Sequence, residues 1–273
     1  LTLREKDVSI MERSDLKHIR LFLLDMDGTL YLGDRLFPFT VPLLHAIRST
    51  GRSYRFLTNN SSKSVRAYVE KLRRLGIEAN EQDFLTSSQA TAYYLRQHYP
   101  DRTLYVCGTQ SLKSELAEHG LRVTEDPDAA DCVVLGFDTE LTFRKLDDVS
   151  RLLCTRDLPY IATHPDLCCP TEYGSVPDCG GLIEMLFYAT GKRPFVVGKP
   201  APLMVELAMR SADCTPDRTA VIGDRLYTDV KSGQNAHAAG ILVLSGETTA
   251  EQAAQADVPP DLILQNAGEL LPY

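Results

Sequence analysis

A run of four apolar residues, Leu21 to Leu24, that ends in Asp25-Met26-Asp27-Gly28-Thr29 constrains the fold of this chain more than any other feature. Four consecutive apolar residues predict a short strand that is buried on both faces, as in a parallel sheet. The turn that follows places two carboxylates at the carboxyl end of the strand, the edge where open α/β sheets bind ligands. Asp-Gly is also a common turn signal, so this stretch alone fits an ordinary acidic loop equally well.

Composition narrows the classes of protein that fit. With 273 residues, 44% of them hydrophobic, the chain can form one or two domains, each with a sizeable core. The net charge of -8, without a compensating run of Lys or Arg, argues against nucleic acid as a partner. Residues 1–7 are too charged for a signal peptide, and the chain has no run of about 18 apolar residues. We therefore expect no membrane association and a cytoplasmic location.

The seven cysteines are odd in number and have no Cys-x-x-Cys spacing. A chain of this size can fold without disulfides, so we expect free thiols. The adjacent pair Cys168-Cys169 lacks the second pair of ligands that a structural zinc site needs.

Apolar strand-like segments alternate with helix-like segments along most of the chain, which predicts an α/β fold with a Rossmann-like parallel sheet. The strands are predicted at 21–24, 54–58, 103–106, 131–136, 159–162, 195–197, 220–222, 241–244 and 262–264. The helices are predicted at 41–50, 63–75, 111–119, 143–155, 181–190 and 202–211, with one more that ends at Gly240.

The second strand ends in Thr58-Asn59-Asn60-Ser61-Ser62, just before the helix predicted at 63–75. The free amides and the dipole of a helix amino terminus favour an anion there. Ordinary N-capping by Ser61 or Ser62 is the alternative interpretation.

Four motifs lie at or near predicted strand ends, in chain order Asp25-x-Asp27-Gly-Thr29, Thr58-Asn59-Asn60, Gly198-Lys199-Pro200, and Gly223-Asp224 followed by Asp229. This set resembles the four motifs of the haloacid dehalogenase superfamily of phosphohydrolases. Each motif alone is weak evidence, but all four occur in the same order, and the resemblance covers essentially the whole chain. It implies a phosphatase that acts through an aspartyl-phosphate.

The spacing of the motifs indicates where an additional domain is inserted. Asp25 and Thr58 are 33 residues apart, whereas Thr58 and Lys199 are 141 apart, so only the second interval can hold a domain. We predict a catalytic core at 1–86 plus 194–273 and an inserted α/β cap at 87–193. The cap position resembles the C2-capped subfamily IIA, which contains nitrophenyl-phosphate, phosphoglycolate and NagD-like phosphatases. His164 departs from that subfamily, where Asn is frequent.

The residues also fit the chemistry that the resemblance implies. Displacing an alkoxide from phosphorus needs a nucleophile and a proton for the leaving oxygen. Asp25 would be the nucleophile, and Asp27 would protonate the leaving group and then accept a proton from the attacking water.

A hard cation, best matched by Mg²⁺, would offset charge on the phosphoryl oxygens. The resemblance implies Asp25, the backbone carbonyl of Asp27, and Asp224 as ligands, with Asp229 ligating directly or orienting a bound water. Asp229 could instead stabilise a helix dipole as a first-turn acid.

Thr58 and Lys199 would hold the phosphoryl oxygens, assisted by Asn59. Substrate choice is predicted to lie in the cap, with His164, Asp166 and Asp178 as candidates. The alternative for Asp178 is plain helix capping.

The expected partner is a small phosphorylated metabolite, such as a sugar phosphate, a nucleoside monophosphate or a phosphoglycolate-like ester. If the chain self-associates, we expect the cap to form the homodimer contact. A phosphomutase on the same fold is the alternative activity. A dehalogenase would not need Asp27, and a binding module without activity would be expected to have lost a motif residue, whereas all are present.

Overall fold

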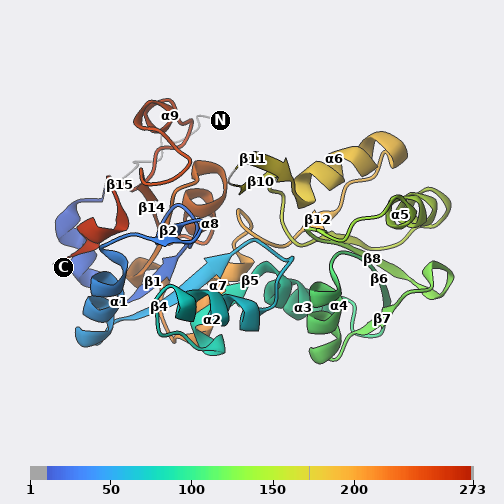
Figure 1. The fold of residues 1–273 in the computed structure, drawn as a ribbon, viewed down its shortest axis with the longest axis horizontal. Helices are drawn as coiled ribbons and strands as arrows, with labels where there is room; N and C mark the ends of the chain where they lie inside the picture. Colours follow the sequence, from blue (N-terminus) through green and yellow to red (C-terminus); the bar gives the residue numbers. More distant parts are fainter. Residues whose placement is uncertain (1–10, 172, 272–273) are drawn as a thin grey trace, which may run out of the picture. The chain divides into compact units, whose positions relative to one another are not determined.

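Strand β1 (Leu21–Leu24) lies inside a parallel sheet in the computed structural model, which describes residues 11–171 and 173–271. All four of its side chains are buried. It pairs in parallel with β13 (Thr219–Gly223) on one side and with β4 (Ser53–Thr58) on the other. Strands β1 and β4 are labelled in Figure 1. The predicted strand with two buried faces is confirmed.

The sheet continues beyond β13 with β14 (Ala239–Val243) and β15 (Leu262–Leu264), giving the order β15-β14-β13-β1-β4. Each neighbouring pair in this order is parallel. The predicted α/β fold with a Rossmann-like parallel sheet is therefore confirmed. Because β1 and β13 are adjacent and parallel, the residues that follow them emerge at the same edge.

Helices α1 (Thr40–Ser49) and α8 (Lys231–Asn235) cover opposite faces of this sheet. Phe22 lines a pocket together with Leu43 and Ile47 of α1. Phe22 pairs with Ala220, so the next residue, Val221, points to the other face, where it lies against α8. Two covered faces explain why β1 is uninterruptedly apolar.

A second sheet has the order β12-β9-β8-β6-β7 and is also parallel. Its strands are β6 (Thr103–Cys107), β7 (Arg122–Thr124), β8 (Cys132–Leu135), β9 (Tyr160–Ala162) and β12 (Phe195–Val196). Figure 1 shows α3 (Ser87–His98) and α4 (Gln110–Glu118) on one face, and α5 (Phe143–Thr155) and α6 (Cys179–Thr190) on the other. Apolar residues of β6, β8, β9, α5 and α6 form one buried cluster.

The chain forms two compact units: residues up to Phe56 together with those from Ala208 onward, and Leu57–Leu207. The domain boundaries predicted at 86/87 and 193/194 are not decided by these units and stay a prediction. All seven cysteines are free thiols. Among the described residues, no helix has the length and hydropathy needed to cross a membrane. The charged stretch 1–7 lies outside the described residues.

Several elements differ from those predicted. The helix predicted to end at Gly240 ends at Asn235, because His237 adopts a left-handed conformation (φ +60°) and Gly240 already belongs to β14. The predicted helix 63–75 is α2 (Val65–Arg74), and its N-cap is Ser64, so the alternative of capping by Ser61 or Ser62 is wrong. The helix predicted at 202–211 is α7 (Leu203–Ser211).

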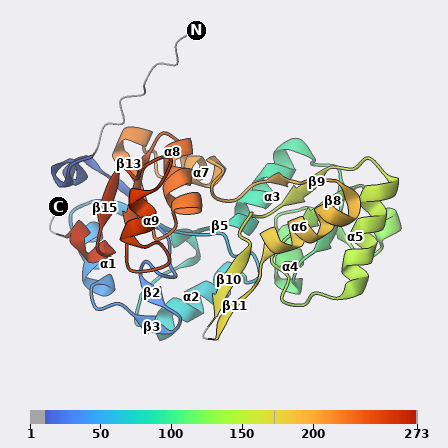
Figure 2. The ribbon, with the colours of Figure 1, turned by 90° about the horizontal axis from the view of Figure 1, so that it is seen from above.

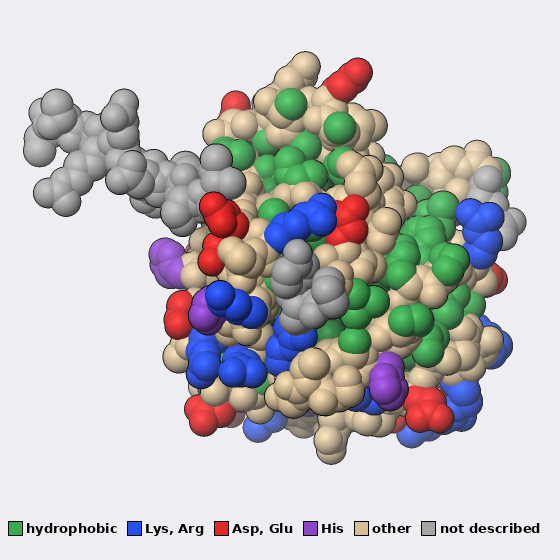
Figure 3. All heavy atoms as spheres, turned by 90° about the vertical axis from the view of Figure 1, so that its left-hand side faces the viewer, with side chains coloured by type: hydrophobic (Ala, Val, Ile, Leu, Met, Phe, Trp, Pro, Cys, Tyr) green, Lys and Arg blue, Asp and Glu red, His purple; other side chains and the backbone are tan. Residues whose placement is uncertain are grey.

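The sequence did not predict helix α3. It also did not predict several short elements. They are the antiparallel pair β2 (Tyr31–Leu32) and β3 (Arg35–Leu36), β5 (Phe84–Thr86), β7, the hairpin β10 (Cys168–Thr171) with β11 (Gly174–Pro177), and α9 (Ala250–Ala254). Figure 2 shows the β10–β11 hairpin projecting beside the start of α6. On the face drawn in Figure 3, Lys and Arg side chains and Asp and Glu side chains occur together, with hydrophobic side chains between them.

Candidate active site

Three carboxylates converge in the unit that contains β1. Asp25 follows β1, Asp224 follows β13, and Asp229 lies in the helical turn Leu226–Val230 that comes next. One oxygen of each lies within 4.8 Å of the others. Asp224 and Asp229 are buried and Asp25 is half-buried. The adjacency of β1 and β13 thus brings together motif residues that are about 200 positions apart in the sequence.

The environment of Asp224 is unfavourable for an isolated carboxylate. Its Oδ2 accepts a hydrogen bond from the Glu247 backbone N–H at 2.7 Å, whereas its buried Oδ1 has no hydrogen-bond partner among the described residues. Burial, together with the neighbouring Asp229, raises the pKa of Asp224 to about 6. Converging oxygen ligands with an unsatisfied buried oxygen fit a hard divalent cation, which would remove both penalties.

Glycines let the backbone approach these carboxylates closely. A Cβ atom on Gly28 would lie 2.4 Å from Asp224 Oδ2, and one on Gly246 would lie 2.0 Å from the same oxygen. A Cβ on Gly223 would lie 2.2 Å from Cγ of Asp229. Ser245 Oγ donates a hydrogen bond to the Gly28 carbonyl at 2.7 Å. The sequence reading missed Ser245 and Gly246, although they directly follow a predicted strand and so carry the same signal as the motifs.

Asp27 has a different setting from the three clustered carboxylates. Its side chain is exposed and does not belong to the cluster. Gly28 after it has a positive φ of 79°, a conformation that L side chains rarely adopt. The roles predicted for Asp27, as acid and base and as a ligand through its backbone carbonyl, stay predictions.

The second group of motif residues lies in the other unit and centres on Lys199. Lys199 is 2% exposed, and its backbone N–H donates to Asn59 Oδ1 at 2.9 Å. Asn59 Nδ2 donates in return to the Lys199 carbonyl at 2.9 Å. Thr58 is buried, and its Oγ1 accepts from the Asn60 backbone N–H at 3.2 Å. The structure therefore brings Asn59 to the backbone of Lys199.

The three candidates for substrate choice form a buried cluster of their own. One polar atom of each of His164, Asp166 and Asp178 lies within 4.8 Å of the others. His164 Nε2 is 2.8 Å from Asp178 Oδ1, and Asp166 accepts from Asn59 Nδ2 at 3.2 Å. Asp178 is also the N-cap of α6, so the alternative of helix capping is observed. Contact of these three residues with a substrate stays a prediction.

Ser61 is a further polar residue whose position the sequence did not predict. Its Oγ accepts from the Phe137 backbone N–H and contacts Thr163 Oγ1, both at 3.0 Å. Thr163 Oγ1 in turn lies 2.9 Å from His164 Nδ1. Ser61 therefore connects the segment after β4 to the carboxyl ends of β8 and β9, and does not cap α2.

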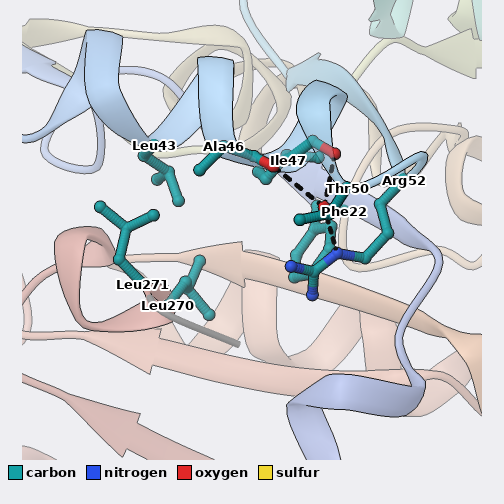
Figure 4. A pocket seen from close by; sticks show the side chains of 8 residues that line it. All are labelled: Phe22, Leu43, Ala46, Ile47, Thr50, Arg52, Leu270 and Leu271. Atoms are coloured by element: carbon teal, nitrogen blue, oxygen red, sulfur yellow. Dashed lines mark hydrogen bonds between the residues drawn. The ribbon is translucent and has the colours of Figure 1, made fainter.

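A pocket elsewhere in the first unit contains none of the motif residues. Figure 4 shows its lining, which is mostly apolar: Phe22, Leu43, Ala46, Ile47, Thr50, Arg52, Leu270 and Leu271. Its volume is about 240 Å³. Arg52 Nε donates to Thr50 Oγ1 at 2.9 Å inside it. The chemistry of the motifs, and not this cavity, identifies the candidate active site.

Comparison with known proteins assigns the family. Residues 22–122 match the family described as haloacid dehalogenase-like hydrolase, and residues 196–270 match the related HAD-hydrolase-like family. The chain is 31% identical over 245 residues to an acid sugar phosphatase of Staphylococcus epidermidis, which covers 90% of this chain and 94% of that one. The chain belongs to the haloacid dehalogenase-like hydrolases.

Other similar proteins are also phosphatases or nucleotidases. The 5'-nucleotidase YutF of Bacillus subtilis is 32% identical, covering 92% of this chain and 97% of its own. The crystal structure of a 4-nitrophenylphosphatase from Thermotoga maritima is 40% identical, with a TM-score of 0.89 over 94% of this chain and 97% of that chain.

A glycerol phosphate phosphatase of Mycobacterium tuberculosis, solved in complex with magnesium, is 31% identical with a TM-score of 0.86, covering 93% of this chain and 78% of that one. It has also been solved in complex with calcium. As a member of this family, with its closely similar fold, the present hydrolase acts on phosphoric monoesters.

Proposed function

We propose that this haloacid dehalogenase-like hydrolase is a Mg²⁺-dependent phosphatase that cleaves a small phosphomonoester through an aspartyl-phosphate. The observation that carries the proposal is the convergence of Asp25, Asp224 and Asp229 at the carboxyl edge of β1 and β13, with a buried oxygen of Asp224 left unsatisfied. Such a set of oxygen ligands suits a hard cation beside a carboxylate nucleophile.

In the proposed reaction the two aspartates of the first motif divide the work. A carboxylate oxygen of Asp25 attacks phosphorus, and the bond from phosphorus to the leaving oxygen breaks. Asp27 donates a proton to that leaving oxygen. Water then attacks the phosphorus of the aspartyl-phosphate and gives its proton to Asp27, which releases phosphate and restores Asp25. The exposed side chain of Asp27 is compatible with proton exchange.

Asp25, Asp224 and Asp229, with the backbone carbonyl of Asp27, would hold the Mg²⁺. When bound, the ion offsets the negative charge that the phosphoryl oxygens carry during transfer. Thr58 and Lys199 would bind those oxygens, and the burial of Lys199 supports a fixed position for it. Charge-assisted hydrogen bonds from an ammonium to phosphate are strong, so phosphate is a suitable ligand for Lys199.

The substrate class follows from the relatives. Their names refer to sugar phosphates, nucleotides, 4-nitrophenyl phosphate and glycerol phosphate, all small phosphomonoesters. We propose the same range here, with phosphoglycolate-like esters included. Seven free thiols are what a reducing compartment maintains, which supports our proposal of a cytoplasmic location. We also propose that the chain binds neither nucleic acid nor a membrane, and that any homodimer forms through the cap.

The test is phosphate release from a panel of these esters, with Mg²⁺, with excess chelator, and with Ca²⁺. We expect activity with Mg²⁺ and none with chelator. Ca²⁺ should bind without supporting turnover, because its looser coordination lets Asp25 bind through both oxygens. Undiminished activity in chelator would contradict the metal site, and absence of phosphate release from every ester would contradict the proposed activity. Transfer of the phosphoryl group to a second sugar hydroxyl would identify a mutase instead.

A further inference from the structure

We infer that Asp166 is a positioning residue, which acts through the Asn59 side chain to fix the backbone of Lys199, and that it controls phosphoryl binding rather than the choice of substrate. The inference rests on the proposed function, because that function assigns the binding of the phosphoryl group to Lys199. It assigns a different role to Asp166, and to Asn59, from the one that the sequence predicts.

The Asn59 amide matches both polar groups of the Lys199 backbone. Its Oδ1 accepts from the Lys199 N–H at 2.9 Å, and its Nδ2 donates to the Lys199 carbonyl at 2.9 Å. A side-chain amide with one donor and one acceptor directed at the same residue holds that residue at a fixed distance and orientation. The contact joins residues that are 140 positions apart in the chain.

Asp166 reinforces the orientation of this amide that the Lys199 backbone also requires. Asn59 Nδ2 has two hydrogens, and the second is directed at Asp166, with distances of 3.2 Å to Oδ2 and 3.4 Å to Oδ1. A carboxylate accepts and cannot donate, so the opposite orientation would place Oδ1 of Asn59 against the carboxylate. With both hydrogens engaged, the Asn59 side chain has no donor left for a phosphoryl oxygen.

The turn that carries Asp166 is itself held firmly by the start of α6. The Gly180 N–H donates to the Asp166 carbonyl at 2.7 Å, and the Asp178 N–H donates to the Leu167 carbonyl at 3.0 Å. A Cβ atom on Gly180 would lie 2.1 Å from the Pro165 carbonyl oxygen. The glycines after Asp178 thus allow α6 to approach this turn, which explains their presence without a ligand.

The segment before Lys199 packs just as tightly on the same groups. The Gly198 N–H donates to the Thr163 carbonyl at 2.8 Å. A Cβ on Gly198 would lie 2.5 Å from that carbonyl oxygen and 2.7 Å from Asn59 Oδ1. Lys199 therefore takes its position from Asn59 and from the turn after β9 together. Asp166 and Asn59 are each 5% exposed, which leaves little surface for contact with a leaving group.

The experiment compares Asp166→Ala with two matched variants. Asp166→Asn keeps an acceptor oxygen for Asn59 and should retain most activity. Asp83→Ala removes another buried carboxylate of the same unit, which accepts the Asn80 N–H at 2.9 Å, and serves as the control for general destabilisation. Thermal melting shows which variants are folded. For Asp166→Ala we expect kcat/KM to fall about 10- to 100-fold, by the same factor for every ester in the panel.

A second measurement separates positioning from a structural role. Binding of inorganic phosphate, followed by calorimetry, should weaken in Asp166→Ala and in Lys199→Ala, and the double variant should bind no more weakly than Lys199→Ala alone. Additive losses, a changed ranking of the esters, or a loss no larger than in Asp83→Ala would overturn the inference. If the wild type releases no phosphate from any ester, the proposed function fails, and phosphate binding still tests the role of Asp166.

Discussion

The buried polar atoms around Lys199 are hydrogen-bonded within the protein, whereas those around Asp25 are partly unsatisfied. Around Lys199, the side chains of Asn59, Asp166, His164 and Asp178 hydrogen-bond to protein partners. Around Asp25, carboxylates converge on one another, and Asp224 keeps a buried oxygen without a partner. A satisfied network holds its members in place, whereas an unsatisfied one gains most from a ligand. This difference fits a role for the group around Lys199 in positioning the phosphoryl group and a role for the group around Asp25 in the reaction itself.

Removing the nucleophile should have the largest effect. Asp25→Asn keeps the size of the side chain, but an amide does not displace an alkoxide from phosphorus. We expect kcat to fall at least about a thousandfold on every ester while the melting temperature is retained. Single-turnover assays with burst analysis measure this directly. Retention of more than about a tenth of the activity would rule out the covalent route.

Adding a side chain at Gly28, one of the glycines that pack against Asp224, should have the next largest effect. Gly28→Ala adds a methyl group where Asp224 Oδ2 lies only 2.4 Å away, so the carboxylate must move. We expect an activity loss of about 10- to 100-fold together with a higher Mg²⁺ requirement. Gly33→Ala is the matched control, because its φ is also positive, at 61°, but nothing lies within 4 Å of the added atom.

For Gly33→Ala only the strain of the left-handed conformation remains, about 1 kcal/mol of stability. Titration of activity with Mg²⁺ and thermal melting of both variants separate the two effects. If Gly28→Ala and Gly33→Ala have equal Mg²⁺ requirements, crowding of Asp224 is not what limits the metal site.

The proton-transfer role of Asp27 predicts a dependence on the leaving group. Asp27→Asn should slow cleavage of an alkyl phosphate about 10- to 100-fold more than cleavage of nitrophenyl phosphate, because nitrophenolate departs without a proton. The ratio of kcat/KM values for the two esters measures this. Equal losses on both would argue against Asp27 as the general acid.

The pair His164 and Asp178 tests whether the satisfied network also reads the substrate. If it does, His164→Ala and Asp178→Ala should change the ranking of esters on the panel by several-fold, with nitrophenyl phosphate least affected. The two residues share a 2.8 Å contact, so the effects of the two substitutions should not add. A uniform loss on all esters would mean that the pair only supports the turn after β9.

Most of what the sequence predicted correctly consists of strands with strongly apolar runs and the polar residues just after them. Asp25 and Asp224 could be predicted as neighbours because adjacent parallel strands end at one edge. The contact of Asn59 with Asp166 could not, since it joins residues 107 positions apart that follow β4 and β9, strands of two different sheets. Short elements such as the β10–β11 hairpin were missed because four-residue strands with mixed polarity carry little periodic signal.

Glu115 tests this comparison, because it is a buried carboxyl with an unsatisfied oxygen that lies in the same unit as the hydrogen-bonded network around Lys199. It lies on α4, and its Oε2 has no hydrogen-bond partner in the part of the chain that the structure describes. Burial, with Glu118 nearby, raises its pKa to about 7. Among the described residues, Glu115 belongs to no group of three metal-ligating side chains, so this carboxyl is expected to relieve its burial by taking up a proton. It therefore predicts a stability effect and no effect on catalysis.

The direction follows from the raised pKa. Below pH 4.5, the ordinary value of a glutamate, the group is protonated in both the folded and unfolded chain and costs nothing. As the pH rises towards 7, the unfolded chain ionises first, so the free energy of unfolding falls, by up to roughly 3 kcal/mol, and is constant above. Glu115→Gln stays neutral throughout. It should be more stable than the wild type by about 1–3 kcal/mol at pH 8 and nearly equal to it at about pH 4, with kcat unchanged. Urea unfolding at the two pH values measures the difference, and an equal stability gain at both would show that ionisation of Glu115 is not the cause.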